Sequence, residues 1–81
     1  MWDTHPVTDY FQHDVLQKRT YLQLDWCLAA INSPVRREIQ PDDGRIRQWV
    51  YVSECEKYLR VVTLADGVTI HNAFFDRRFK P

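Results

Sequence analysis

The spacing of apolar residues changes at Pro34, and this change limits the possible folds more than any other feature of the chain. In residues 21–32, before it, Leu22 and Trp26 belong to one apolar stripe at helical spacing. Pro34 disfavours helical backbone at Ser33, so this helix should end there. After Pro34, apolar and polar residues alternate, as in a strand with one buried face. The chain is therefore predicted to place helices first and strands second.

A further helix is predicted earlier in the chain, over residues 8–19. Thr8 is a candidate N-cap and Asp9 would lie in the first turn, where a negative charge is favourable. Phe11 and Val15 then follow at helical spacing. The N-terminal part of the chain thus predicts two helices.

Four segments after Pro34 have the character of strands. The last two flank Asp66-Gly67, a dipeptide that favours a tight hairpin turn. Strands in this order form an antiparallel sheet with the helices on one face. We therefore predict an α+β fold, with two N-terminal helices packed on one face of a four-stranded antiparallel sheet, the strands being residues 35–40, 45–52, 58–65 and 68–75.

The length of the chain allows one domain, residues 1–81. A chain this short buries only about 60% of its unfolded surface and has too little apolar surface for a second core. Residues 1–7 are expected to form an arm, either packed or flexible, and residues 77–81 an exposed tail.

The hairpin predicts which side chains share a face. A two-residue turn at Asp66-Gly67 would pair Arg60 with Ala73. His71 would then lie on the outer face, away from the helices, as a diagonal neighbour of Arg60. An even-length connection before the third strand would place Arg60 opposite Tyr51. In this register the helix-facing residues of the last strand are Ile70, Asn72 and Phe74.

The predicted outer face combines arginines with aromatic rings. Arginine binds phosphate through two parallel hydrogen bonds, and aromatic rings stack on unpaired bases, so the mixture suits single-stranded RNA. An ordinary solvated face, or an anchor surface for another protein, has a similar composition. The candidate RNA-binding residues are Arg45, Arg47, Trp49, Tyr51, Tyr58 and, beyond the last strand, Lys80.

Charge is distributed unevenly along the chain. The net charge is zero, but residues 1–43 carry four Lys/Arg against seven Asp/Glu, and residues 44–81 carry seven against four. A basic C-terminal half suits phosphates, whereas the acidic half weakens any general attraction to nucleic acid. Overall charge thus neither supports nor excludes an RNA partner.

The outer face also contains candidates for RNA cleavage. Such a reaction needs an acid and a base, together with positive charge on the phosphorane. Arg60, His71 and Arg77 or Arg78 have suitable side chains, although a single strand histidine is often only structural. Second-rank candidates are His13 and Lys18.

The sequence contains no motif for the other classes of site considered. Cys27 and Cys55 lack the CxxC spacing of metal or redox sites, and no two histidines have ligand spacing. There is no apolar leader and no apolar run of about 20 residues that would span a membrane. We therefore expect free thiols, no cofactor, no metal, no membrane partner and a cytoplasmic location.

The order of several segments resembles a known family. "HDVLQKR", a helix ending in "NSP", "DGRIRQW", "KYLRVVTL" followed by "DG", and a last strand ending in "FDRR" are similar to the BrnT-type toxins of the RelE/ParE toxin–antitoxin superfamily. The resemblance covers about residues 11–78. It implies a RelE/BrnT-like fold, with Arg60 and Arg77 or Arg78 at the scissile phosphate.

The same resemblance implies a function. A toxin of this type would be a metal-independent endoribonuclease that cleaves RNA, mainly messenger RNA, through attack of the 2′-hydroxyl. Its partner would be a cognate antitoxin that covers the active face. The absence of a tyrosine near the C-terminus favours activity without the ribosome. The alternatives are a non-catalytic protein-interaction module and a gyrase-directed toxin like ParE.

Overall fold

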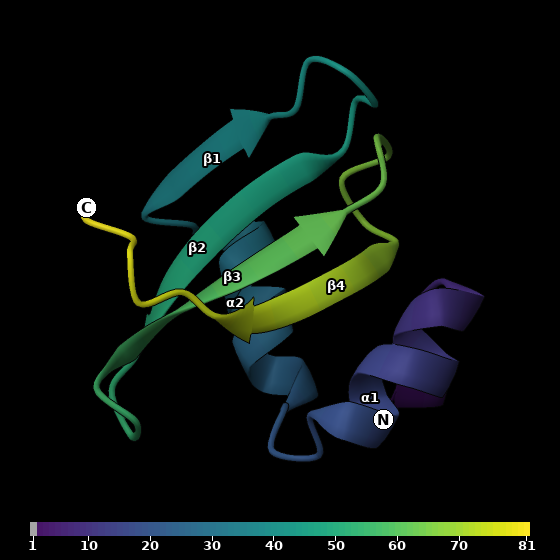
Figure 1. Ribbon diagram of the computed structural model, residues 1–81, viewed down its shortest axis with the longest axis horizontal. Coiled ribbons are helices and arrows are strands. Elements are labelled where there is room, and N and C mark those ends of the chain that lie inside the picture. The colour runs from purple at the N-terminus through teal and green to yellow at the C-terminus, as the bar shows by residue number, and fades with distance from the viewer. Residues whose placement is uncertain (1) are drawn as a thin grey trace.

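The computed structural model describes residues 2–81, which form an α+β fold. Its sheet has the strand order β1-β2-β3-β4, and every neighbouring pair is antiparallel. In Figure 1 the helix of residues 24–32 lies behind the sheet, the first helical segment lies beside the edge formed by the last strand, and the other face of the sheet is turned to the viewer. The predicted class, with two short helices and a four-stranded antiparallel sheet, is confirmed. The elements are η1 (Trp2–Thr4), η2 (Phe11–Val15), α1 (Leu16–Lys18), α2 (Leu24–Asn32), β1 (Arg36–Ile39), β2 (Ile46–Val52), β3 (Lys57–Thr63) and β4 (Ile70–Phe75).

The first helical segment covers residues 9–18 and includes η2, which is π-helical, and α1. The N–H of Phe11 donates a hydrogen bond to Thr8 Oγ1 at 3.1 Å, which satisfies a backbone donor that the helix leaves free. Thr8 is therefore the N-cap, as predicted. Phe11 and Val15 are fully buried and fix this segment to the core.

The second helix, α2, is shorter than predicted. It begins at Leu24, because residues 20–21 form a turn in which the N–H of Leu22 donates to the carbonyl of Arg19. It ends at Asn32, immediately before Ser33-Pro34, as the sequence predicts. The buried side of this helix is made of small residues, which allow a close approach to the sheet.

The hydrophobic core lies between the helices and the sheet. Side chains from both helical segments meet side chains from β2, β3 and β4 there. Each of these apolar side chains leaves water on folding, which contributes most of the stability of such a small domain. The buried residues of this cluster are Phe11, Val15, Leu22, Cys27, Ala30, Val52, Leu59, Val61, Ile70 and Ala73.

The pairing of β2 with β3 differs from the prediction by two residues. Arg60 lies opposite Trp49, and Tyr51 lies opposite Tyr58, so the predicted pair of Arg60 with Tyr51 is wrong. A four-residue turn, residues 53–56, closes this hairpin. Because a shift of two residues preserves the alternation of a strand, Trp49 and Arg60 remain on the outer face, as predicted.

The turn between β3 and β4 is longer than the predicted two residues. The Asp66 carboxylate accepts hydrogen bonds from the N–H groups of Val68 and Thr69, both at 2.9 Å, and Gly67 has a positive φ of 72°. The loop therefore closes through the N–H of Leu64, which donates to the carbonyl of Thr69 at 2.9 Å. Gly67 takes the left-handed conformation that favours glycine.

A β-bulge at His71 changes the register of β4. Thr63 pairs with Ile70, but Val62 pairs with Asn72, so His71 has no partner on β3. Arg60 consequently lies opposite Phe74 and not opposite Ala73. The predicted pairing is wrong beyond this point.

The bulge exchanges the two faces of the second half of β4. Ala73 is fully buried in the core, and Phe75 packs against Tyr21 and Trp26 on the helix side. Asn72 and Phe74 take the outer face. The predicted assignment of these four residues to faces is therefore wrong, whereas Ile70 is helix-facing and buried, as predicted.

The N-terminal segment packs along β4. The N–H of Ile70 donates to the carbonyl of Pro6 at 3.1 Å, and the N–H of Thr8 donates to the carbonyl of Ile70 at 3.0 Å. The Trp2 and Phe11 rings lie 5.3 Å apart. Residues 2–8 thus cover the edge of β4 next to the bulge.

No helix within residues 2–81 is long and apolar enough to cross a membrane.

Candidate functional site

The C-terminal tail turns back across the outer face of the sheet. Figure 1 shows it leaving β4 and passing the ends of β3 and β2 towards β1. The Phe79 ring stacks on Trp49, with centroids 4.7 Å apart and planes 14° apart, and it lies 5.1 Å from Tyr58. Trp49 is only 4% exposed as a result. The predicted RNA-binding residue Trp49 is therefore covered by the protein's own tail.

Asp76 fixes the start of this tail. Its carboxylate accepts a hydrogen bond from the Trp49 indole N–H at 3.0 Å and lies 3.9 Å from the Arg60 guanidinium. It also accepts a hydrogen bond from the N–H of Arg78 at 3.1 Å, and its own N–H donates to the carbonyl of Tyr58. One carboxylate thus joins the tail to β2 and β3.

Arg60 lies on the outer face between two aromatic rings. Its guanidinium carbon is 5.8 Å from the centre of Trp49 and 5.2 Å from that of Phe74. Burial lowers the pKa of Arg60 below its ordinary value, as does nearby Arg47, whereas Asp76 acts in the opposite direction. The Arg60 Nε–H is buried and has no hydrogen-bond partner among the described residues. This donor carries a desolvation cost that a nearby anion or oxygen would remove.

His71 does not lie beside Arg60. Its Nδ1 is 3.0 Å from Thr8 Oγ1, and its ring is 5.0 Å from Tyr10, so it contacts the N-terminal segment. Phe74, which lies opposite Arg60, is three positions further along β4, and this corresponds to about 10 Å along a strand. The predicted diagonal pair is wrong because the bulge inserts His71 out of register.

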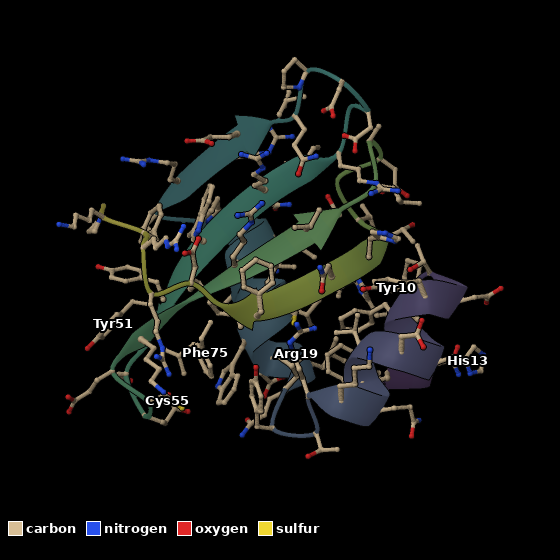
Figure 2. All side chains as sticks on the ribbon, viewed as in Figure 1. Tyr10, His13, Arg19, Tyr51, Cys55 and Phe75 are labelled. Carbon is tan, nitrogen blue, oxygen red and sulfur yellow. The ribbon has the colours of Figure 1, made fainter. Side chains whose placement is uncertain are left out.

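A groove at the end of β4 gathers cations that the sequence did not single out as a group. Among the described side chains, none of its three cations, Arg19, Lys57 and Arg77, is paired with a carboxylate. Figure 2 shows both Arg19 and Phe75 near the end of β4. We define the cationic groove as Arg19, Tyr21, Lys57, Phe74, Phe75 and Arg77.

Aromatic rings contact two of the three cations of this groove, Arg19 and Lys57. The Tyr21 and Phe75 rings are stacked, 5.3 Å apart and 12° from parallel. Lys57 Nζ lies 5.4 Å from the centre of Phe75, and the Arg19 guanidinium carbon lies 5.8 Å from that of Phe74. Rings and unpaired cations at this spacing offer stacking surfaces and phosphate contacts in one place.

The other predicted RNA-binding arginines are already engaged. Arg45 pairs with Asp43 at 3.7 Å, and Arg47 donates to the Gln40 side-chain oxygen at 2.9 Å. Arg47 also lies 3.8 Å from Glu38. These two arginines are less available to a ligand than those of the groove.

The remaining candidates are dispersed, and all but the half-buried Tyr58 are exposed. The Tyr51 and Tyr58 rings lie 5.1 Å apart at the end of the β2–β3 hairpin. His13 points away from the sheet on the first helical segment in Figure 2, and Lys18 is exposed near the end of that segment. Arg78 and Lys80 are exposed along the tail. Of the predicted catalytic residues, Arg60 and Arg78 share a contact with Asp76, Arg60 through its guanidinium and Arg78 through its backbone N–H.

Sequence reasoning missed Arg19 and Lys57 because nothing local distinguishes them. Arg19 follows the last helical residue, where a solvated cation is common. Lys57 begins β3 and is only brought to Arg19 by the packing of Phe75. The available signal was the pair Phe74-Phe75, which places aromatic rings on both sides of an edge strand.

The cysteines do not form a reactive centre. Burial raises the pKa of the Cys27 thiol to about 12, which keeps it protonated and unreactive at neutral pH. Cys55 is half-buried, and both thiols are free. Within residues 2–81, no three His, Cys, Asp or Glu side chains cluster as a metal site.

The chain was compared with protein-family models, with curated proteins and with solved structures. No match was found in any of the three. The geometry of the groove and of the tail therefore carries the functional argument.

Asp76 should be important for stability. We expect Asp76→Ala to lower the free energy of unfolding by about 1–3 kcal/mol, because it leaves the Trp49 and Arg60 donors without their acceptor. Chemical denaturation measures the change. The control Asp42→Ala, in the exposed β1–β2 turn, should change it by no more than about 0.5 kcal/mol. Equal effects of the two substitutions would contradict the assigned role of Asp76.

His71 should make stability depend on pH. Burial lowers its pKa, nearby Arg45 lowers it further, and Asp43 opposes them, so the folded state favours neutral imidazole. The unfolded chain therefore binds the proton first, and stability should fall as the pH drops below about 6.5. Denaturation at pH 7, 6 and 5 should show this fall and a shallower one for His71→Gln. An equally steep fall in the variant would refute the assignment.

Proposed function

We propose that this protein is the RNA-directed toxin of a bacterial toxin–antitoxin pair, and that its cationic groove holds the RNA. The observation that carries the proposal is the set of three unpaired cations beside stacked aromatic rings in one groove. The resemblance of the sequence to BrnT-type toxins supports the biological role. The α+β architecture agrees with the RelE/BrnT-like fold that this resemblance implies.

The electrostatics of the chain favour local binding over a general attraction. The net charge is zero, so no long-range field draws nucleic acid to the whole surface. Binding must come from the groove cations, each of which releases a counterion when it contacts a phosphate. Single-stranded RNA suits the groove better than a duplex, because only unpaired bases expose their faces to Tyr21 and Phe75.

Cleavage is the part of the proposal that depends on the resemblance. It assigns Arg60 and Arg77 or Arg78 to the phosphorane, and the Asp76 carboxylate contacts the Arg60 guanidinium and the backbone N–H of Arg78. His71 cannot act as acid or base at Arg60 in this conformation, because it lies about three residues along β4 from the partner of Arg60. The proton acceptor for the 2′-hydroxyl must then come from another group near Asp76.

A second candidate function is a protein-interaction module, and β1 favours it. All four residues of this edge strand are exposed, and the apolar side chains of Val35 and Ile39 at its ends are 52% and 61% exposed. An open edge of this kind can accept an additional strand from a partner. The same edge would serve the antitoxin if the protein is a toxin, so partner binding alone does not separate the two functions.

RNA binding tests the role of the groove. We expect Arg19→Gln/Arg77→Gln to weaken binding of a labelled single-stranded RNA by about tenfold or more at low salt, because two phosphate contacts are lost. Fluorescence anisotropy measures the affinity. The control Arg37→Gln/Arg45→Gln removes the same charge outside the groove and should have a much smaller effect. Equal losses would show that only total charge matters.

Induced expression in bacteria tests toxicity and cleavage together. We expect growth arrest and new RNA 5′ ends at defined sites, read by primer extension. The variant Arg60→Ala/Arg77→Ala/Arg78→Ala should produce neither, after circular dichroism has shown that it folds. Arrest with intact RNA and DNA-damage signalling would support a gyrase-directed toxin instead. Normal growth would support the interaction module.

A further inference from the structure

We propose that Phe79 occupies a binding slot for a nucleobase, formed by Trp49, Arg36 and Tyr58, and that a base of single-stranded RNA displaces it. This inference rests on the proposed RNA-directed function. It adds a second ligand-binding position on the outer face, beside the cationic groove, and gives the C-terminal tail the role of a cover.

The slot has the geometry with which proteins hold an unpaired base. Phe79 stacks on Trp49 nearly in parallel, at 4.7 Å and 14°, and the Arg36 guanidinium carbon lies 5.0 Å from the centre of the Phe79 ring. Tyr58 forms a side wall, tilted by 59° at 5.1 Å. An aromatic platform and an arginine over the same ring are the contacts that an unpaired base receives in RNA-binding proteins.

The tail is held weakly compared with a core residue. After Asp76, its described backbone contacts include only the N–H of Arg78 to the Asp76 side chain and a long bond, 3.3 Å, from the N–H of Phe79 to the Asp76 carbonyl. Lys80 and Pro81 are exposed, and Phe79 itself is half-buried. No helix or strand covers this face in Figure 1, so the ring can leave without disrupting the core.

The slot is continuous with the cationic groove. A pocket lined by Lys57, Phe75 and Arg77 of the groove is also lined by Tyr58 and Phe79. An RNA strand whose phosphates lie on Lys57 and Arg77 therefore has a path to the slot. Displacing Phe79 would also uncover the neighbourhood of Arg60, whose Nε–H lacks a partner in the closed arrangement.

Charge favours a nucleobase over an aromatic side chain of a partner protein. Arg36 and Arg60 flank the slot. The pocket beside it is lined by the cations Lys57 and Arg77 and by the carboxylates of Glu56 and Asp76, of which Asp76 already accepts hydrogen bonds from Trp49 and Arg78. A base in an RNA strand is accompanied by backbone phosphates that these cations can bind, whereas a neutral aromatic side chain of a protein is not. A molecule in which Phe79 fills the slot cannot bind a base there. The apparent affinity for RNA is therefore reduced in proportion to the fraction of molecules in which the slot is open.

The test compares Phe79→Ala with Phe79→Tyr. We expect Phe79→Ala to bind a short single-stranded RNA about three- to tenfold more tightly than the unaltered protein, because the slot is open. Phe79→Tyr keeps a ring in the slot and should bind like the unaltered protein. Adding Arg36→Gln, an exposed position, to Phe79→Ala should remove the gain.

An oligonucleotide with abasic sites separates the base from the phosphates. Phe79→Ala should bind it no more tightly than the unaltered protein does, and the NMR signal of the Trp49 indole N–H should shift only with the base-containing strand. An equal gain with the abasic strand, or no gain with either, overturns the slot while leaving the groove intact. If neither the unaltered protein nor any variant binds RNA, both proposals are overturned. A gain only for a co-purified protein partner overturns the slot in favour of protein docking.

Discussion

The β-bulge at His71 decides what each face of the molecule presents. It leaves Ile70 in the core but exchanges the faces of every later residue of β4, so that Phe75 joins the helices and Phe74 reaches Arg60. Both rings then border the same groove, together with Arg19 and Lys57. Without the extra residue, Phe75 would lie on the outer face and the groove would lose the ring on which Tyr21 stacks.

The bulge also determines how the chain leaves the sheet. Asp76, directly after β4, reaches both Trp49 and Arg60 from its position, and the turn that follows carries Phe79 over Trp49. Trp49 and Tyr58, two of the aromatic residues predicted to bind RNA, are thus in contact with the tail, and the unpaired cations of the groove lie at the strand ends. This division between a filled slot and an open groove underlies both proposals.

Local sequence signals predicted the elements of this fold well, because each has a local physical cause. Pro34 ends α2, Thr8 caps the first helical segment, and the alternation in β2 and β3 puts Trp49 and Arg60 on the outer face. These outcomes depend on backbone sterics, capping and burial within a few residues. The faces of the residues after His71 did not follow from such signals.

The features that the sequence did not predict depend on contacts between side chains and between residues far apart in the chain. Backbone hydrogen bonds from Ile70 to Pro6 and from Thr8 to Ile70 accompany the bulge, and the residues involved are more than sixty positions apart. The longer turn depends on the Asp66 side chain, which satisfies two backbone donors that a two-residue turn would have placed differently. The cationic groove likewise joins Arg19, Lys57 and Arg77, which only tertiary packing brings together.

The central claim is that RNA binds at the end of β4, and NMR titration with a short single-stranded RNA tests it most directly. The account predicts that backbone amide shifts concentrate at residues 19, 21, 56–58, 74–77 and 79, which line the groove and the tail pocket. Shifts confined to β1, or to the segment around His71 and Tyr10, would contradict it. So would a titration that leaves the spectrum unchanged.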